Sequence, residues 1–391
     1  MKKILAILGR VGTTYGGAEL HMLELCSFLK LKYEIRVAAE FVQDEYRHVF
    51  SSLVFRRLKI TSFFYFLRQK LKFRGFGRLG MWVDACYKFF QLIKYSKGSD
   101  AIMTPYYSYD NSLVLAAVWL SKLIKKPLIL RLFAHFSTFG SDEFKRRSKA
   151  FWESSFLKYI YKNSNFIIVC TQAEKKWLSQ FVLPSKLAIV GVSPYLVESG
   201  QRISVRKKLN IEKEMVLFIG RKQLYKGFGV LLEAAQLVWK SFDRCCFVFI
   251  GADTVDSHCL FENVCDTRII NLGLVSQEDK LAALSECDIF CMPSQAESFG
   301  IVFLEAWAFK KPVIAAELEP LRDIIKHREN GFLIQPDAVS VANAIIELLK
   351  DSGLRNRLGE NGYRLFHEEY SSDVISRKYL ALFDEWLNKE K

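Results

Sequence analysis

The chain has 391 residues, half of them hydrophobic and a quarter charged, which excludes a disordered protein and is too long for one hydrophobic core. Residues 1–200 carry 31 Lys and Arg against 14 Asp and Glu, a net charge of +17, whereas residues 201–391 carry 25 against 28, a net charge of −3. The excess positive charge of the N-terminal half predicts an anionic partner, such as a membrane surface, a nucleic acid or a phosphorylated substrate.

Short apolar runs alternate with segments of helical periodicity along the chain. The expected strands, in chain order, are residues 4–8, 35–39, 101–104, 128–133 and 166–170, then a second series at 215–219, 246–250, 288–292 and 313–316. Near-continuous apolar strands separated by helices predict parallel sheets that are covered on both faces. We therefore expect an α/β fold of two Rossmann-like, doubly wound domains that bind ligands in a deep interdomain cleft, beyond the carboxyl ends of the strands.

A polar stretch, residues 197–214, separates the two series of strands. We expect the domain boundary there, with an N-terminal domain of residues 1–198 and a C-terminal domain of residues 199–370. The last segment, residues 371–391, opens with a Ser/Asp capping signal and has helical periodicity. It predicts a terminal helix that packs back across the N-terminal domain.

The nine cysteines lack the paired CxxC spacing of a zinc site. Cys245, Cys246, Cys287 and Cys291 fall in apolar runs, where a free thiol packs as a small hydrophobe. The first residues, MKKILAILGR, lack a cleavable signal, and no apolar run reaches the ~20 residues that span a bilayer. We expect reduced cysteines and a cytoplasmic protein, soluble or peripheral on the inner face of the cytoplasmic membrane.

Two cations flank the turn that follows the strand at 215–219. In FIGRKQLYKGFG the strand ends at Gly220, Arg221 and Lys226 follow, and Gly227 leads into a helix. Two cations beside a helix N-terminus suit a diphosphate, because the backbone amides and the helix dipole add to the charge of the side chains. The pair alone is equally consistent with a solvated loop.

Two glutamates lie eight residues apart in SQAESFGIVFLEAWA. Glu297 follows the strand at 288–292, and Glu305 lies about one turn into the helix that starts at Gly300. The amides around Phe299, Gly300 and Ile301 are placed to attract an anion, and a carboxylate beyond them can accept hydrogen bonds from sugar hydroxyls. Glu297 alone could be an exposed loop acid. The apolar helical neighbours of Glu305 instead predict a buried carboxylate, which requires a partner.

Together these elements resemble the family 4 retaining glycosyltransferases. Glu297 and Glu305 match the E-x7-E motif of that family, and the GRxxxxKG turn lies upstream of them as it does in the family. The GGAE at Gly16–Glu19 is similar to the family's N-terminal glycine-rich loop. The segment PVIAAELEPLRDIIKHRENGFLIQPD follows the family pattern through Pro312, Asn330 and Gly331. The combination is far more specific than any one of its parts.

The resemblance implies a GT-B fold that binds a UDP- or GDP-sugar donor mainly in the C-terminal domain and the acceptor in the N-terminal domain. It implies that Arg221 and Lys226 neutralise the diphosphate, that Glu305 holds the ribose hydroxyls and that Glu297 contacts the donor sugar. The amides of Phe299, Gly300 and Ile301 would cover the phosphates and the sugar. Gly16 and Gly17 would let the N-terminal loop close over the donor.

His135, in RLFAHFSTFG, matches a histidine that the family places against the donor sugar, although a structural role is the common one for a histidine at a strand end. Glu297 and His135 are the candidate catalytic residues. Because cations and helix amides can stabilise the departing nucleoside diphosphate, we expect neither a metal nor a cofactor. The resemblance implies a hexosyltransferase that retains the anomeric configuration.

Three positions depart from the family pattern. Lys310 stands where the family usually has a glycine, and Asp323 in ELEPLRD replaces a glutamate that follows a glycine pair. The N-G-(I/V)-D motif near the interdomain linker is reduced to Val190-Gly191-Val192-Ser193. These departures concern the contacts of the nucleotide base and the identity of the donor.

The segment from Arg56 to Lys97 combines eleven Lys and Arg with one acid, Asp84, among many aromatic residues, and FKRRSK at Phe144–Lys149 adds further positive charge. A solvated helical face and an interfacial amphipathic helix on anionic headgroups are both consistent with it. No recognisable nucleic-acid-binding module is present, so we expect no nucleic-acid partner.

These features predict transfer of a sugar to a lipid-linked or glycan acceptor in lipopolysaccharide, O-antigen, capsule or exopolysaccharide biosynthesis. The alternatives are a GT-B nucleotide-sugar epimerase or soluble disaccharide synthase, and a non-catalytic protein that binds a membrane or a nucleic acid.

Overall fold

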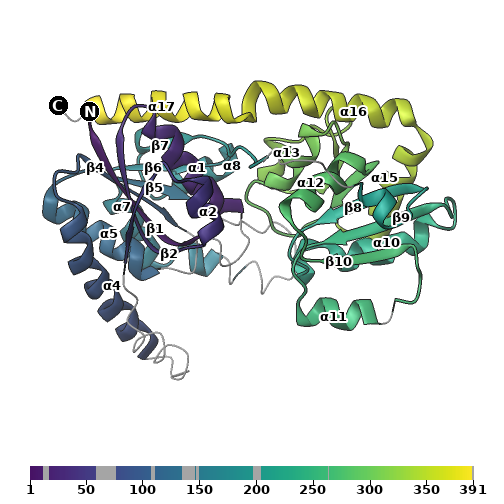
Figure 1. The fold of residues 1–391 in the computed structure, drawn as a ribbon, viewed down its shortest axis with the longest axis horizontal. Helices are drawn as coiled ribbons and strands as arrows, with labels where there is room; N and C mark the ends of the chain where they lie inside the picture. Colours follow the sequence, from purple (N-terminus) through teal and green to yellow (C-terminus); the bar gives the residue numbers. More distant parts are fainter. Residues whose placement is uncertain are drawn as a thin grey trace. The chain divides into compact units, whose positions relative to one another are not determined.

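The protein is described by a computed structural model that covers residues 1–11, 17–58, 76–106, 111–133, 146, 149–196, 204–262 and 264–389. The chain forms two compact units (Figure 1). The first comprises Met1–Ala134, Ala150–Gly191 and Ile375–Lys391, and the second includes Val192–Val374.

The first unit contains a seven-stranded parallel sheet with the strand order β3-β2-β1-β4-β5-β6-β7. Its strands are β1 (Lys3–Val11), β2 (Glu34–Val42), β3 (Val54–Arg57), β4 (Ala101–Tyr106), β5 (Leu128–Leu132), β6 (Phe166–Val169) and β7 (Leu187–Ile189). Its helices are α1 (Gly17–Lys30), α2 (Asp44–Val49), α4 (Phe76–Tyr95), α5 (Asn111–Ile124), α7 (Ser155–Asn163), α8 (Gln172–Leu178) and the short η1 (Pro184–Lys186).

The second unit contains a six-stranded parallel sheet with the order β10-β9-β8-β11-β12-β13. Its strands are β8 (Glu214–Ile219), β9 (Cys245–Ile250), β10 (Ile269–Gly273), β11 (Ile289–Met292), β12 (Val313–Ala316) and β13 (Phe332–Ile334). Its helices are α9 (Val205–Lys208), η2 (Leu224–Lys226), α10 (Phe228–Val238), α11 (Val255–Glu262), α12 (Gln277–Glu286), α13 (Ile301–Ala308), α14 (Glu319–Arg322), α15 (Ala338–Lys350), α16 (Ser352–Leu365) and the π-helical η3 (Phe366–Tyr370).

The predicted class of fold is confirmed, because both sheets are parallel and their central strands are buried on both faces. In β1 the run Ile4–Leu8 is completely buried, and so is nearly all of β8 and β9. Side chains that are buried on both faces give the near-continuous apolar runs seen in the sequence. The cysteines of β9 and β11 lie in this core, and burial raises the pKa of the Cys246 thiol to about 11.

The C-terminal helix α17 (Ser372–Lys389) packs largely on the first unit. The hydroxyl of Tyr379 lies 3.0 Å from Nε2 of the buried His21, and the Trp386 ring stacks on Phe166 with 4.4 Å between centroids. Burial, assisted by the charge of Arg131, lowers the pKa of His21, so the imidazole is neutral in this contact. A chain segment that follows the second unit therefore completes the core of the first.

Lys310 shows how the chain meets one departure from the glycosyltransferase pattern. Its φ of +58° lies in the left-handed region that favours glycine. Gly359 of α16 approaches this turn so closely that a Cβ there would lie 2.0 Å from the Lys310 carbonyl oxygen. The backbone keeps the conformation that a glycine would adopt, and the Lys310 ammonium is held outside by Glu360 at 2.9 Å.

Within the described ranges, no helix combines the length and the apolarity needed to cross a membrane.

Candidate nucleotide-sugar site

The candidate site lies where the strand order of the second sheet reverses. β8 and β11 are neighbours in the sheet, but their connections run toward opposite edges, to β9 and β12. The loops that follow β8 and β11 therefore leave the same end of the sheet side by side, the usual position of a ligand in a doubly wound fold. These loops carry the GRxxxxKG turn and the first glutamate of the E-x7-E pattern.

Gly227 allows these two loops to touch. It has a φ of +81° and forms the N-cap of α10, and a Cβ at this position would lie 2.3 Å from the Pro293 carbonyl oxygen. Beside it, the amide of Gln295 donates a 2.6 Å hydrogen bond to the Tyr225 carbonyl. Only glycine combines this backbone conformation with so close an approach, so the GRxxxxKG glycine locks the two loops together.

Lys226 and Glu297 form an ion pair across these loops. The Lys226 Nζ lies 2.7 Å from Glu297 Oε2, and the two side chains are 16% and 8% exposed. Burial by itself lowers the pKa of Lys226, but the adjacent Glu297 carboxylate more than reverses this effect, so the lysine stays charged. The second oxygen of Glu297 accepts a 3.2 Å hydrogen bond from the Ser298 amide. Lys226, which is expected to bind the diphosphate, thus also orients Glu297, which is expected to contact the sugar.

Glu305 is a buried carboxylate on the first turns of α13. One of its oxygens, Oε1, accepts a 2.8 Å hydrogen bond from Lys280 Nζ of α12, and the other, Oε2, is buried and has no hydrogen-bond partner among the described residues. A buried acceptor without a partner is costly in a native protein. The Glu305 side chain, 8% exposed, is therefore arranged with one oxygen anchored and one open to a donor such as a hydroxyl group.

The N-terminus of α13 supplies backbone amides beside these carboxylates. Gly300 is its N-cap, with a φ of +74°, and no side chain caps the helix. Since the first amides of a helix have no partner within the helix, they can bind an anion. Ile301 begins the helix, and the buried Phe299 packs edge-on against Tyr370 with 5.6 Å between centroids. The amides of Gly300 and Ile301 therefore lie at the N-terminus of α13, directly after the loop that carries Glu297.

Lys280 and Lys222 are site residues that the sequence did not suggest. Lys280 lies on the helix α12, and only the packing of α12 against α13 brings it to Glu305. Lys222, next to Arg221, is completely buried and bonds to Asp253 Oδ1 at 3.0 Å and to the Gly251 carbonyl at 2.6 Å. Arg221 itself is exposed after β8. The pattern GRK after a strand carries two cations, but it does not say which of them faces solvent.

Three of the expected site residues lie in, or directly next to, segments that the structure does not describe. His135 and Gly16 lie outside the residues that the structure describes, and Gly17 is the first residue of α1. Within the described part of the chain, no group of three or more His, Cys, Asp or Glu side chains is arranged to hold a metal ion.

Residues 201–365 match the protein family described as "Glycosyl transferases group 1". The chain is 27% identical over 314 residues to N,N'-diacetylbacillosaminyl-diphospho-undecaprenol alpha-1,3-N-acetylgalactosaminyltransferase of Campylobacter jejuni, covering 76% of this chain and 80% of that protein. It is 35% identical over 194 residues to the lipopolysaccharide core biosynthesis glycosyltransferase LpsE of Rhizobium meliloti, covering 47% of this chain and 54% of that one. Several matches thus span less than two thirds of the relative, among them 63% of an uncharacterized glycosyltransferase of Methanocaldococcus jannaschii.

Among solved structures, the crystal structure of Anabaena HepE in complex with UDP and glucose is similar, with a TM-score of 0.74 and 16% identity over 98% of this chain and 100% of that one. Sucrose-phosphate synthase from Thermosynechococcus elongatus has a TM-score of 0.75 and 18% identity, with full coverage of both chains. At these identities the likeness concerns the fold, and both neighbours have the GT-B architecture. The chain thus has the GT-B fold of two parallel-sheet units, and residues 201–365 match the group 1 glycosyltransferases.

Proposed function

We propose that the protein transfers a sugar, with retention of the anomeric configuration, from a UDP- or GDP-sugar to a lipid-linked or glycan acceptor in the assembly of a cell-surface polysaccharide. The observation that carries the donor assignment is the open oxygen of Glu305, which is held beside an uncapped helix N-terminus and the Lys226–Glu297 pair. The names of relatives support the acceptor class, since one refers to a diphospho-undecaprenol substrate and another to the lipopolysaccharide core.

Each group of the site takes a part in donor binding. Glu305 accepts a hydrogen bond from a ribose hydroxyl through Oε2, while Lys280 holds its other oxygen. Arg221, Lys226 and the amides of Phe299, Gly300 and Ile301 receive the diphosphate and the edge of the sugar. The co-crystallised UDP and UDP-glucose in structural neighbours support a nucleotide-sugar ligand for this fold.

Sugar transfer then proceeds by stabilising the negative charge that develops on the nucleoside diphosphate. Preorganised cations and amides act strongly in a site that excludes water. Glu297, oriented by Lys226 at 2.7 Å, contacts the donor sugar, and His135 is the second proposed catalytic residue. Gly16 and Gly17 let the loop before α1 close over the donor. Because these groups carry the required positive charge, we expect transfer to continue after dialysis against EDTA, without a cofactor.

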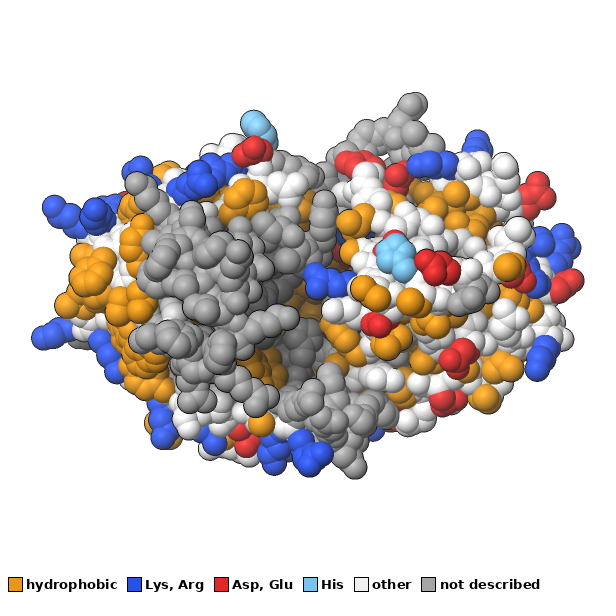
Figure 2. All heavy atoms as spheres, turned by 90° about the horizontal axis from the view of Figure 1, so that it is seen from below, with side chains coloured by type: hydrophobic (Ala, Val, Ile, Leu, Met, Phe, Trp, Pro, Cys, Tyr) orange, Lys and Arg blue, Asp and Glu red, His pale blue; other side chains and the backbone are white. Residues whose placement is uncertain are grey.

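The first unit is proposed to receive the acceptor and to meet an anionic membrane on the cytoplasmic side. Trp82, Cys86, Phe90 and Lys94 recur every fourth residue on α4, and all four side chains are exposed, Trp82 by 49% and Phe90 by 65%. Apolar side chains and cations on one helical face favour an interfacial position. Figure 2 shows apolar side chains beside Lys and Arg side chains on the described surface of this unit.

The opposite face of α4 makes polar contacts within the first unit. Lys88 lies 3.0 Å from Asp84 on the preceding turn and also pairs with Glu40 of β2, and the Lys88 and Glu40 side chains are 5% and 8% exposed. The Lys88 ammonium also donates a 2.9 Å hydrogen bond to the Ser112 hydroxyl on α5. Lys88 and Asp84 of the basic segment are therefore paired with each other within the unit. Only the exposed face of α4 is proposed to contact the membrane.

The donor is tested by screening UDP- and GDP-sugars for thermal stabilisation of the full chain, because a ligand that binds the folded state raises its melting temperature. Glu305→Gln and Arg221→Gln should each reduce the shift, whereas Glu233→Gln, an exposed glutamate on α10, should leave it unchanged. Equal shifts in all four proteins would contradict the site.

The membrane proposal is tested by sedimentation with vesicles of phosphatidylglycerol and phosphatidylcholine. Binding should fall as salt rises and should fall further in Trp82→Ser/Phe90→Ser. Binding that ignores both salt and these substitutions would contradict a role for α4.

A further inference from the structure

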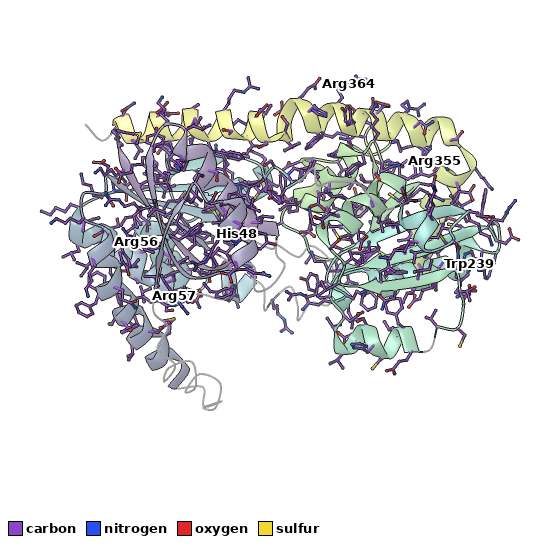
Figure 3. All side chains as sticks on the ribbon, viewed as in Figure 1. His48, Arg56, Arg57, Trp239, Arg355 and Arg364 are labelled. Carbon is purple, nitrogen blue, oxygen red and sulfur yellow. The ribbon has the colours of Figure 1, made fainter. Side chains whose placement is uncertain are left out.

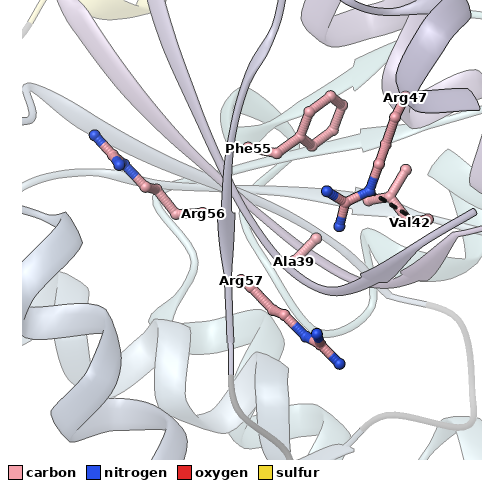
Figure 4. Close-up of a pocket in the computed structure, with 6 residues that line it drawn as sticks. All are labelled: Ala39, Val42, Arg47, Phe55, Arg56 and Arg57. Atoms are coloured by element: carbon pink, nitrogen blue, oxygen red, sulfur yellow. Dashed lines mark hydrogen bonds between the residues drawn. The ribbon is translucent and has the colours of Figure 1, made fainter. Parts of the chain in front are cut away.

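A hollow of about 140 Å³ opens at the edge of the first sheet. It is lined by Ala39, Val42, Arg47, Phe55, Arg56 and Arg57 (Figure 4). Figure 3 labels two of these residues, Arg56 and Arg57. A single water needs only ~10–15 Å³ of such space, so the hollow has room for a polyatomic group. It lies at the carboxyl ends of β2 and β3, the end of a parallel sheet at which ligands bind.

The local sequence builds the two sides of this hollow. In β3 successive side chains point to opposite faces, so Phe55 and Arg57 share one face and Arg56 takes the other, as Figure 4 shows. Ala39 pairs with Arg57 in the parallel ladder between β2 and β3. The methyl group of Ala39, almost completely buried, leaves space beside the Arg57 guanidinium that a larger residue would fill.

Arg47 faces the same space from the helix α2. Its Nε donates a 3.0 Å hydrogen bond to the Val42 carbonyl, and its guanidinium lies 6.0 Å from the centre of the Phe55 ring. With Nε engaged, the two terminal nitrogens remain as donors, and Figure 4 shows them turned toward the hollow. The Val42 carbonyl therefore positions the Arg47 guanidinium, and the alternation of side chains along β3 positions that of Arg57.

Two of the three positive charges around the hollow have no ion-pair partner among the residues that the structure describes. Arg56 and Arg57 form no ion pair there, and the one acid beside Arg47 is Asp44, whose carboxylate is 3.9 Å from Nε and 94% exposed. Charged side chains on an edge strand also discourage pairing with another sheet, which explains a charge on β3. That role does not require a second arginine from α2 to face the same hollow, nor a small buried residue between them.

We propose that Arg47 and Arg57 bind the phosphate or diphosphate group of the acceptor. A guanidinium offers paired N–H donors that match the oxygens of a phosphate, and two guanidiniums on one hollow suit a group with more than one negative charge. This assignment rests on the proposed function, because it names the chemical group of the acceptor that the first unit holds. Arg57 supplies the guanidinium from the strand, beside Ala39 in the ladder between β2 and β3.

The test is titration of the full chain with inorganic pyrophosphate, in the presence of enough UDP to occupy the site in the second unit. Arg57→Gln should weaken pyrophosphate binding about tenfold, and Arg47→Gln/Arg57→Gln about a hundredfold, since each charged hydrogen bond contributes about tenfold. The matched control is Lys97→Gln, which removes one positive charge from an exposed position of the same unit that does not line the hollow. Lys97→Gln/Arg364→Gln, with Arg364 exposed on α16 of the second unit, controls for the loss of two charges.

Retention of binding in Arg47→Gln/Arg57→Gln, or an equal loss in the control, would overturn the proposal. A soluble short-chain prenyl diphosphate should displace pyrophosphate, and its failure to do so would overturn the acceptor assignment. Displacement by phosphatidylglycerol vesicles but not by the prenyl diphosphate would instead indicate a headgroup surface. Affinity for UDP, measured on the same variants, should stay at the wild-type value, so a failure of the nucleotide site is seen separately.

Discussion

Replacing Glu305 by glutamine removes one charge from α13 while keeping the shape of the side chain. In the free protein, Oε1 is held by Lys280 at 2.8 Å, and Oε2 has no hydrogen-bond partner in the part of the chain that the structure describes. If Oε2 receives a ribose hydroxyl, the carboxylate accepts a charged hydrogen bond that the amide of glutamine replaces poorly. Such a bond contributes ~1.5–3 kcal/mol, so nucleotide binding should weaken roughly 10- to 150-fold.

The assay is a thermodynamic cycle that changes the protein and the ligand together. Wild-type protein and Glu305→Gln are titrated calorimetrically with UDP or GDP, whichever binds more tightly, and with the matching 2′-deoxy and 3′-deoxy nucleotides. Wild-type protein should discriminate against at least one deoxy nucleotide, and Glu305→Gln should lose most of that discrimination. The difference isolates the pairwise interaction of Glu305 with the hydroxyl.

The free protein should respond differently from the complex. Replacing a buried ion pair by apolar residues of similar volume is often neutral or stabilising by ~1–4 kcal/mol. Lys280→Met/Glu305→Leu should therefore unfold at the same or a higher denaturant concentration than wild type, although it no longer binds nucleotide. Such a result would mark the pair as retained for binding rather than for folding.

Two outcomes would refute this reasoning. Discrimination between nucleotide and deoxy nucleotide that survives in Glu305→Gln would remove the ribose assignment. Normal affinity in Lys280→Met/Glu305→Leu would remove Glu305 from the site altogether. Glu233→Gln, which removes an exposed carboxylate from the same unit, should match wild type in both measurements.

Three further predictions concern contacts inside each of the two units. Gly227→Ala should lower the free energy of unfolding by at least ~1 kcal/mol, because it forces an L-residue to a φ of +81° and against Pro293, whereas Gly80→Ala, in open space on α4, should raise it by ~0.5–1 kcal/mol. The pKa of Lys226 is raised on folding, so its ion pair stabilises the protein fully below the ordinary lysine pKa of ~10.4 and less above it. The difference in unfolding free energy between wild type and Lys226→Met should therefore be constant from neutral pH to about pH 10 and shrink only at higher pH; a decline near neutral pH would contradict the charged pair. Tyr379→Phe should cost ~1–2 kcal/mol in chemical denaturation, because it leaves a buried histidine nitrogen without its partner, and an unchanged midpoint would show that α17 is held by its other contacts.

The buried strands could be predicted from the sequence, and the edge strands could not. β1, β4, β8 and β9 are buried on both faces, so nearly all of their side chains are apolar and form a continuous run in the sequence. β3 (Val54–Arg57) was missed because it lies at the edge of the sheet, with Val54 53% exposed and two arginines in four residues. The half-buried β10 and the three-residue β7 and β13 were missed for the same reason. A search for apolar runs therefore could not find β3, the strand that lines the hollow at Arg57.

Within the candidate site, sequence alone determined whatever one loop and one helix can hold. The eight-residue spacing of Glu297 and Glu305 fixes both carboxylates relative to Gly300, because a strand end, a short loop and a helix start are local structures. The positive φ at Gly227 and Gly300 belongs to the same class, since glycine marks these conformations along the chain.

Only the tertiary structure decided the partners of these carboxylates. Lys226 lies 71 residues before Glu297, and they meet because β8 and β11 are neighbours in the sheet. Lys280 lies 25 residues before Glu305, on a helix whose sequence carries no sign of a ligand. Strand order and helix packing set such distances through the burial of apolar surface over the whole unit, which no short stretch of sequence records.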